Sequence, residues 1–250
     1  MNAPKTLLVT GGSRGIGAAI VRMAAARGWL VAFSYVANRE AADSLSRELE
    51  ETGAKALAVQ ADVGSEADVM RLFETVDAHF GSLDGLVNNA GVVDQKARID
   101  EMSGERLERM FRINVIGSIL CAREAVKRMS SRHGGRGGAI VNLSSAAARL
   151  GSSGEYVDYA ASKGAIDTFT VGLAREVATE GVRVNAVRPG MIDTEIHASG
   201  GQPDRIERMR ALIPMKREGR ADEIAAAVLW LLSDEASYTT GALLDVSGGR

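Results

Sequence analysis

Residues 6–17 read Thr-Leu-Leu-Val-Thr-Gly-Gly-Ser-Arg-Gly-Ile-Gly. An apolar run that ends at glycines is typical of a strand covered on both faces of a parallel sheet. Glycine permits positive φ and close backbone approach, and the helix that follows directs free N–H groups and its positive end at the turn. The spacing is G-x3-G-x-G rather than the commoner G-x-G-x-x-G, but the strand–turn–helix context predicts a pyrophosphate site for a dinucleotide.

Short β-rich runs alternate with longer helical patterns along the rest of the chain. This alternation predicts a Rossmann-type, doubly wound sheet of seven parallel strands with helices on both faces, in a single domain that spans residues 1–250. A (β/α)8 barrel is the rival, but seven strands and the glycine turn argue against it. The expected strands are Thr6–Thr10, Leu30–Tyr35, Ala56–Gln60, Leu83–Val87, Ala139–Leu143, Arg183–Val187 and Leu243–Val246. The expected helices are Ile16–Arg27, Arg39–Thr52, Glu66–Phe80, Ser103–Ser131, Val157–Glu180 and Asp222–Leu232.

The composition limits the classes of function. Hydrophobic residues make up 46% of the 250 and charged residues 25%, with a net charge of -2, so there is no broad electrostatic case for nucleic acid or an anionic membrane. No apolar run reaches the ~20 residues that span a bilayer. The single cysteine, Cys121, excludes an intramolecular disulfide and suits a reducing compartment. We therefore expect a soluble cytoplasmic protein, and the scattered histidines predict no metal site.

Tyr159 and Lys163 lie four positions apart, so they share one face of the expected helix. A nearby ammonium favours the phenolate, and lowering the pKa of tyrosine by roughly 3 units takes about 4 kcal/mol. The pair therefore offers a proton donor and acceptor for a carbonyl/alcohol interconversion. By itself the pattern is weak, because Tyr-x3-Lys occurs by chance on many helices.

The end of the second strand bears on the choice of cofactor. NAD-binding sheets usually carry a carboxylate there for the ribose 2′-OH, but the segment Ser34–Arg39 has no acid before Glu40. Arg14 and Arg39 could instead pair with a 2′-phosphate, which favours NADP(H) over NAD(H). The alternative is that both arginines are merely solvated.

Four ordered motifs carry a family resemblance: the glycine turn, Asn88-Asn89-Ala90-Gly91, Tyr159-x3-Lys163 and Arg188-Pro189-Gly190. Together they resemble the short-chain dehydrogenase/reductase (SDR) family over essentially the whole chain. Within that family the chain is similar to bacterial 3-oxoacyl-carrier-protein reductases and sugar 1-dehydrogenases. The resemblance implies an NAD(P)-dependent oxidoreductase that transfers a hydride between nicotinamide and a carbonyl or secondary alcohol.

The resemblance also implies a catalytic set of Asn114, Ser145, Tyr159 and Lys163. Tyr159 would act as the acid/base, and Ser145 would donate to the substrate oxygen. Lys163 would bind the nicotinamide ribose and bias Tyr159 toward phenolate, and Asn114 would hold a water of a proton relay. From the residues alone, Asn114 could equally satisfy backbone groups within its helix, and Ser145 could cap a turn.

The position of the serine departs from the family pattern. The family serine commonly precedes the tyrosine by 13 positions, which falls on Ala146 here. Ser145 is preferred because it ends the strand motif Asn142-Leu143-Ser144-Ser145, with one extra residue placed in 150–158. Ser144 remains the alternative.

The resemblance extends to the cofactor contacts. Asp62 and Val63 follow the third strand, where the family contacts the adenine, although Asp62 could instead cap the next helix. The implied cofactor-binding residues are Gly11, Ser13, Arg14, Gly15, Ile16, Gly17, Tyr35, Asn38, Arg39, Asp62, Val63, Asn89, Ala90, Gly91, Tyr159, Lys163, Pro189, Gly190, Ile192 and Thr194.

The segment 191–214 is expected to form a lid over a small-molecule carbonyl or alcohol substrate. Tyr156, Glu195, His197, Ser199 and Met215 are candidate pocket residues. Family resemblance implies homotetramers or homodimers. Two other functions stay open: an NAD-dependent sugar or polyol dehydrogenase, and a non-catalytic dinucleotide-binding sensor on the same fold.

Overall fold

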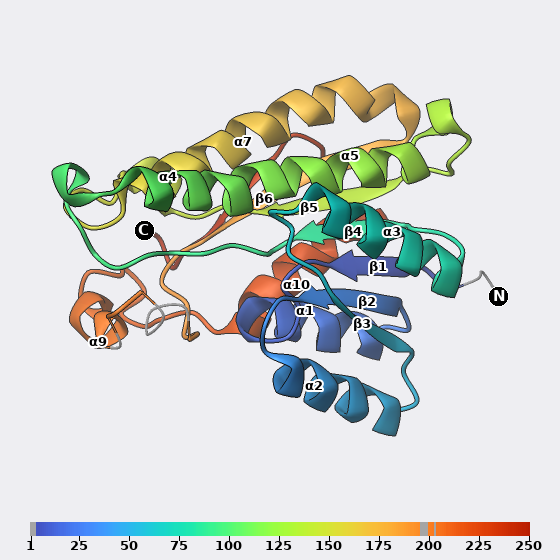
Figure 1. The fold of residues 1–250 in the computed structure, drawn as a ribbon, viewed down its shortest axis with the longest axis horizontal. Coiled ribbons are helices and arrows are strands. Elements are labelled where there is room, and N and C mark those ends of the chain that lie inside the picture. Colours follow the sequence, from blue (N-terminus) through green and yellow to red (C-terminus); the bar gives the residue numbers. More distant parts are fainter. Residues whose placement is uncertain (1–3, 196–199, 203) are drawn as a thin grey trace.

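The computed structural model describes residues 4–195, 200–202 and 204–250. Its centre is a seven-stranded sheet in the order β3-β2-β1-β4-β5-β6-β7, and every neighbouring pair is parallel (Figure 1). The predicted doubly wound α/β fold is therefore confirmed. The strands are β1 (Thr6–Val9), β2 (Leu30–Tyr35), β3 (Ala56–Gln60), β4 (Gly85–Asn88), β5 (Gly138–Leu143), β6 (Val182–Pro189) and β7 (Leu243–Val246).

Helices cover both faces of the sheet. Figure 1 shows α1, α2 and α10 on one side, and α4, α5 and α7 on the other. None of the described helices is long and apolar enough to cross a membrane. The helices are α1 (Gly15–Ala26), α2 (Arg39–Glu51), α3 (Glu66–Phe80), α4 (Gly104–Phe111), α5 (Ser118–Met129), α6 (Ala147–Leu150), α7 (Val157–Val177), α9 (Arg205–Arg210) and α10 (Ala221–Leu232).

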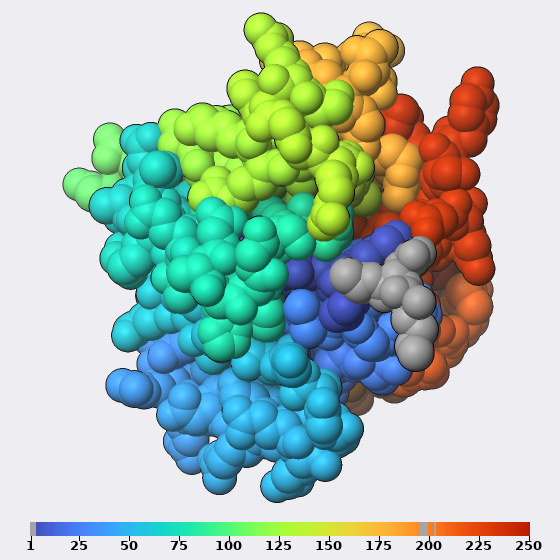
Figure 2. Space-filling view, turned by 90° about the vertical axis from the view of Figure 1, so that its right-hand side faces the viewer, coloured from blue at the N-terminus to red at the C-terminus, as the bar shows by residue number. Residues whose placement is uncertain are grey.

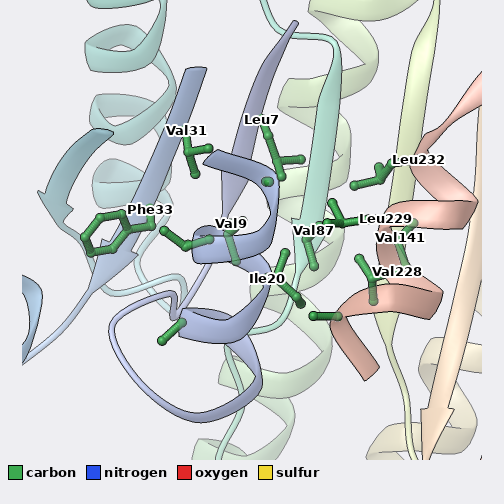
Figure 3. Close-up of a cluster of buried hydrophobic side chains, with 14 of the residues drawn as sticks. Leu7, Val9, Ile20, Val31, Phe33, Val87, Val141, Val228, Leu229 and Leu232 are labelled. Carbon is green, nitrogen blue, oxygen red and sulfur yellow. The ribbon is translucent and has the colours of Figure 1, made fainter. Parts of the chain in front are cut away.

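The core lies in two layers, one on each face of the sheet. Successive strand residues point to opposite faces, so Leu7 and Val9 enter one hydrophobic cluster and Leu8 enters the other. In Figure 3, Ile20 of α1 and Val228 of α10 lie against the first of these faces, beside β1 and β4. Because both faces are buried, the central strands are apolar throughout, as the sequence predicts.

The single helix predicted over Ser103–Ser131 is wrong in detail. The structure has α4, a π-helical segment at Arg112–Gly117, then α5, and a separate 3₁₀ turn at Ser131–His133. The apolar spacing of the sequence does not distinguish one wider turn from regular α-helix. Short π-helical segments occur often at functional sites, and this one contains Asn114.

The loops that follow the strands gather at one end of the sheet, on the left of Figure 1 beside α9. Ligands of open α/β sheets bind beyond the carboxyl ends of the strands, so this end is the expected site. Figure 2 shows the opposite end, where the loops that lead into the strands meet and a C-terminal segment (red) projects.

Candidate active site

The glycine turn after β1 is shaped by very close backbone packing. A Cβ on Gly17 would lie 2.3 Å from the carbonyl oxygen of Gly11 and 2.6 Å from the side-chain nitrogen of Asn89. Gly11 itself has φ of +64°. Both positions therefore require glycine. α1 begins at this turn, and Arg14 at its N-cap makes no side-chain capping bond, so no cap satisfies the first N–H groups of the helix.

Two residues that the sequence analysis did not single out hold the turn in place. The Ser34 hydroxyl accepts a hydrogen bond from the Gly11 N–H at 3.1 Å. The Thr10 hydroxyl accepts from the N–H groups of Asn89 and Ala90, each at 3.0 Å. In return, the Asn89 side chain donates to the carbonyl oxygens of Thr10 and Gly11, each at 2.9 Å. The loop after β4 is thereby tied to the turn after β1.

A cavity of about 660 Å³ opens over this turn. Fourteen of the residues implied as cofactor contacts line it: Gly11, Ser13, Arg14, Gly15, Ile16, Gly17, Tyr35, Asn38, Asp62, Val63, Asn89, Ala90, Gly91 and Thr194. Glu195, expected at the substrate, lines this cavity instead.

Arg39 is not among the residues that line the described part of this cavity, contrary to the expectation from the sequence. The Asn38 side chain accepts from the Ala41 N–H at 3.0 Å, so Arg39 is the first residue of α2. Its side chain is 77% exposed and lies 3.7 Å from Asp43, one helical turn on. Arg14 does line the cavity, with Nη1 3.4 Å from Oε2 of Glu195.

Asp62 lies at the cavity edge and does not cap α3. Its Oδ1 accepts from the Gly64 N–H at 2.8 Å, and its Oδ2 lies 3.6 Å from Nη1 of Arg112. The cap of α3 is Ser65, whose hydroxyl accepts from the Asp68 N–H. The helix-cap alternative for Asp62 is therefore wrong.

A second cavity, of about 380 Å³, adjoins the first. Ile16, Asn89, Gly91, Val93 and Thr194 line both, so the two form one crevice. The second cavity contains the predicted Ser145, Tyr159 and Lys163, together with Pro189, Gly190 and Ile192. The loop after β5, the start of α7 and the end of β6 bring these residues together.

Lys163 is buried at the floor of the second cavity. Its Nζ donates to the carbonyl oxygen of Leu143 at 2.7 Å and lies 5.6 Å from the centre of the Tyr159 ring. Burial lowers the pKa of Lys163 to about 8, and the negative charge of Asp167 partly opposes this. Lys163 therefore titrates near neutral pH.

The pKa of Tyr159 moves in the opposite direction to the sequence expectation. Burial raises this pKa, because the phenolate loses its hydration, while the nearby Ser145 hydroxyl and the Arg205 charge act to lower it. The expected lowering by Lys163 is not seen, and the Lys163 Nζ is directed to the Leu143 carbonyl. Tyr159 is therefore a protonated phenol at neutral pH.

The two candidate serines have different surroundings. The Ser144 hydroxyl is buried and donates to the carbonyl oxygen of Lys163 at 3.2 Å. The Ser145 oxygen accepts from the Ala147 N–H at 3.1 Å, and its hydroxyl lies within hydrogen-bonding range of Tyr159. The Ser145 proton can therefore point into the cavity, which favours Ser145 over Ser144.

Asn114 lies in the π-helical segment, and its side chain is hydrogen-bonded to the loop after β4. Its Oδ1 accepts from the Val92 N–H at 2.8 Å, and its Nδ2 donates to the Val92 carbonyl oxygen at 2.9 Å. The backbone groups that it satisfies thus lie outside its own helix. A Cβ on Gly91 would meet the Asn114 Oδ1 at 3.3 Å and the Lys163 Nζ at 3.6 Å, so both side chains border this glycine.

Sequence reasoning missed part of the wall of the second cavity. Arg205 and Met209 of α9 line it, as does Arg250. These residues are far from the motifs along the chain, and no spacing signals their position. Tyr156 lines the cavity as expected, whereas Met215 is exposed and outside the described lining. His197 and Ser199 lie outside the described residues.

The lowered pKa of Lys163 gives stability a pH dependence. A buried lysine destabilises the fold while it is charged, so this cost is full below pH 8 and is lost as the pH rises toward 10.5. We expect the free energy of unfolding to rise by about 2 kcal/mol between pH 7 and 9.5, relative to Lys163→Met. Urea unfolding of both proteins at the two pH values measures this, and an unchanged difference would contradict it.

Residues 11–250 match a family model described as enoyl-(acyl carrier protein) reductase. The chain is 53% identical to the "Uncharacterized oxidoreductase YgfF" of Escherichia coli, over 97% of this chain and 98% of that protein. It is 38% identical to "Glucose 1-dehydrogenase 2" of Bacillus subtilis, over 98% of this chain and 94% of that protein.

Among solved structures, the chain is similar to a blue fluorescent protein from a metagenomic library in complex with NADPH. The identity is 37%, the TM-score is 0.90, and the match covers 98% of this chain and 97% of the other. Matches of this length extend over the sheet and over both cavities. The chain thus belongs to the short-chain dehydrogenase/reductase family of oxidoreductases.

Proposed function

We propose that this protein is an NADP(H)-preferring oxidoreductase that interconverts a carbonyl and a secondary alcohol on a small molecule. The observation that carries the proposal is the placement of Ser145 and Tyr159 together in a cavity that adjoins the glycine turn. The turn fits a pyrophosphate, because α1 begins there with no side-chain cap on its first N–H groups, and because the close packing of Gly17 against the Gly11 carbonyl oxygen shapes the turn. A bound nicotinamide supplies the hydride.

The residues of the chain supply orientation and the proton. Tyr159 donates its phenolic proton to the carbonyl oxygen, and the Ser145 hydroxyl donates a hydrogen bond to the same oxygen. Lys163 holds the ribose hydroxyls, and Asn114 fixes the loop beside Lys163 and extends the path of the proton to solvent. Because burial raises its pKa further, Tyr159 is protonated at neutral pH, which is the state that donates a proton in carbonyl reduction.

Three observations support NADP(H). The end of β2 has no carboxylate before Glu40, and Arg14 lines the cavity beside Tyr35 and Asn38. The blue fluorescent relative is in complex with NADPH. The competing proposal is an NAD-dependent sugar or polyol dehydrogenase, which the similarity to a glucose 1-dehydrogenase favours.

A test of cofactor preference can distinguish the roles of Arg14 and Arg39, because Arg14 lines the cavity and Arg39 lies outside its described lining. We expect Arg14→Ala to raise the KM for NADPH about tenfold more than the KM for NADH, as a charge-assisted contact to phosphate is worth roughly 1.5 kcal/mol or more. The matched control Arg39→Ala should change both values by less than about twofold. Equal effects of Arg14→Ala on the two cofactors would show that this arginine does not read the 2′-phosphate.

The activity is tested by a screen that follows the absorbance of reduced nicotinamide. The panel contains acyl-thioester ketones, sugars, quinones and small cyclic ketones, each with NADPH and with NADH. Turnover that depends on Tyr159 supports the proposal. Tight cofactor binding with no turnover across the panel would favour the non-catalytic sensor instead.

Assembly and location stay as predictions. The exposed apolar residues Phe111, Ile116 and Ile119 lie in and between α4 and α5, which supports the proposal of homodimers or homotetramers built on this side. The cytoplasmic location is proposed on the composition alone. The lid over 191–214 is likewise a proposal, and its residues 196–199 and 203 lie outside the described residues.

A further inference from the structure

We propose that the second cavity takes a substrate that carries a carboxylate, and that Arg205 binds this carboxylate. This inference rests on the proposed function, because it names the class of carbonyl or alcohol substrate for the same site.

The charge of the described cavity lining is unbalanced. Lys163, Arg205 and Arg250 are cationic, and Glu155 is the anionic side chain among the described lining residues. The remaining wall is mainly apolar and includes four serines, Ser144, Ser145, Ser152 and Ser153. A cation held in an apolar and partly enclosed space attracts an anion more strongly than the same cation in open water. The lining therefore fits an apolar substrate with one anionic end.

The guanidinium of Arg205 is held in a defined orientation. Its Nη2 donates to Oε2 of Glu155 at 2.7 Å, and its Cζ lies 4.8 Å above the centre of the Tyr156 ring. The Arg205 side chain is 13% exposed. Its other N–H groups have no hydrogen-bond partner among the described residues. A planar guanidinium with fixed orientation suits a carboxylate and loses little freedom when it binds one.

The ring beneath Arg205 is itself fixed. The Tyr156 hydroxyl donates to the carbonyl oxygen of Gly200 at 3.3 Å and accepts from the side chain of Gln202. Tyr156 is buried and directly precedes α7, three residues before Tyr159. The position of Arg205 is thus set by the two residues that directly precede α7, the helix that carries the proposed acid/base.

Arg205 lines the same cavity as Tyr159 and Ser145. Its positive charge also acts to lower the pKa of Tyr159, against the effect of burial. A substrate whose carbonyl oxygen lies at Tyr159 and Ser145 could therefore place a carboxylate at Arg205 within one cavity. Small cyclic or branched oxo- and hydroxy-acids have this form.

The competing interpretation is that Arg205 only anchors α9, through Glu155, to the residues that precede α7. Arg208 provides the matched control, because it lies on the same helix, α9, and also anchors it. Its Nη2 donates to the Gln202 side chain at 2.6 Å, its side chain is half-exposed, and it is outside the described lining. An anchoring role predicts similar effects for the two arginines, whereas anion binding predicts an effect of Arg205 alone.

The test measures binding without turnover. Cyclohexanecarboxylate and the uncharged cyclohexanecarboxamide are titrated calorimetrically into the full chain with NADPH present. We expect the carboxylate to bind at least tenfold more tightly to the wild-type protein, which is the size of a charge-assisted hydrogen bond. In Arg205→Gln this ratio should fall to about one, and in Arg208→Gln it should stay at the wild-type value.

Glu155→Gln adds a test in which the affinity ratio of carboxylate to carboxamide should rise rather than fall. If Arg205 binds the carboxylate, loss of the competing Glu155 charge should raise the ratio above the wild-type value. If Arg205 is only an anchor, Glu155→Gln should weaken both ligands alike, as Arg205→Gln would. The proposal is overturned if the wild-type protein shows no carboxylate preference, or if Arg205→Gln leaves the preference intact.

The outcome is separable from that of the proposed function. A carboxylate preference in a protein that turns over no carbonyl compound would contradict the proposed activity and support the Arg205 site. Turnover of carbonyl substrates with equal binding of acid and amide would support the activity and contradict the Arg205 site.

Discussion

Tyr159→Phe is expected to lower turnover at least a hundredfold while the affinity for NADPH changes little. The substitution removes one hydroxyl and keeps the ring, so the wall of the cavity is unchanged. General acid catalysis by a placed side chain contributes about a hundredfold to ten-thousandfold. Ser145 loses the Tyr159 hydroxyl as a neighbour but keeps its own position. Its hydrogen bond to the substrate oxygen should therefore provide the residual rate.

Tyr156→Phe is the matched control for this substitution. Tyr156 precedes Tyr159 by three residues and lines the same cavity, but its hydroxyl is hydrogen-bonded to the Gly200 carbonyl oxygen and the Gln202 side chain. We expect its turnover to fall by less than about tenfold, since no proton transfer depends on it. Steady-state kcat and a fluorescence titration of NADPH give the two quantities. If Tyr159→Phe kept near-normal kcat, another group would have to move the proton.

Gly17→Ala is expected to weaken NADPH binding by about a hundredfold. The new Cβ would lie 2.3 Å from the Gly11 carbonyl oxygen, so the backbone of the turn must shift. Overpacking of this kind costs up to about 3 kcal/mol, and where the turn relaxes to avoid it, NADPH must restore the binding shape at a similar cost, which is about a hundredfold in Kd. The shift also displaces the N–H groups that would bind the pyrophosphate. Calorimetric titration with NADPH measures the loss.

Gly172→Ala provides the control, because Gly172 lies in α7 and its added Cβ would meet no described heavy atom within 4 Å. An exposed helical glycine replaced by alanine should leave NADPH binding unchanged and stabilise the fold by about 0.5–1 kcal/mol. Equal NADPH affinity in Gly17→Ala and Gly172→Ala would mean that the turn does not form the cofactor site.

The sheet could be predicted from the sequence because its signals are local. Apolar runs such as Leu7–Val9 and Ala139–Val141 identify strands, and the glycine spacing identifies the first turn. The pair Tyr159 and Lys163 needs only the period of one helix. These features depend on neighbours within about one or two turns of chain.

The remaining features depend on contacts between distant segments. Arg205 reaches the cavity from α9, more than forty residues after Tyr159, and no periodicity indicates it. Arg39 is moved away from the cavity because Asn38 caps α2, and competition between capping and ligand binding is not visible in the sequence. The pKa of Tyr159 is raised by burial, which a helical spacing does not report.

The mutual hydrogen bonds between Thr10 and Asn89 have a mechanical consequence. They join the segments after β1 and β4 into a single rigid frame that borders both halves of the crevice. A dinucleotide that lies on the glycine turn would therefore also keep a fixed position relative to the segment after β4, because the two segments move as one unit.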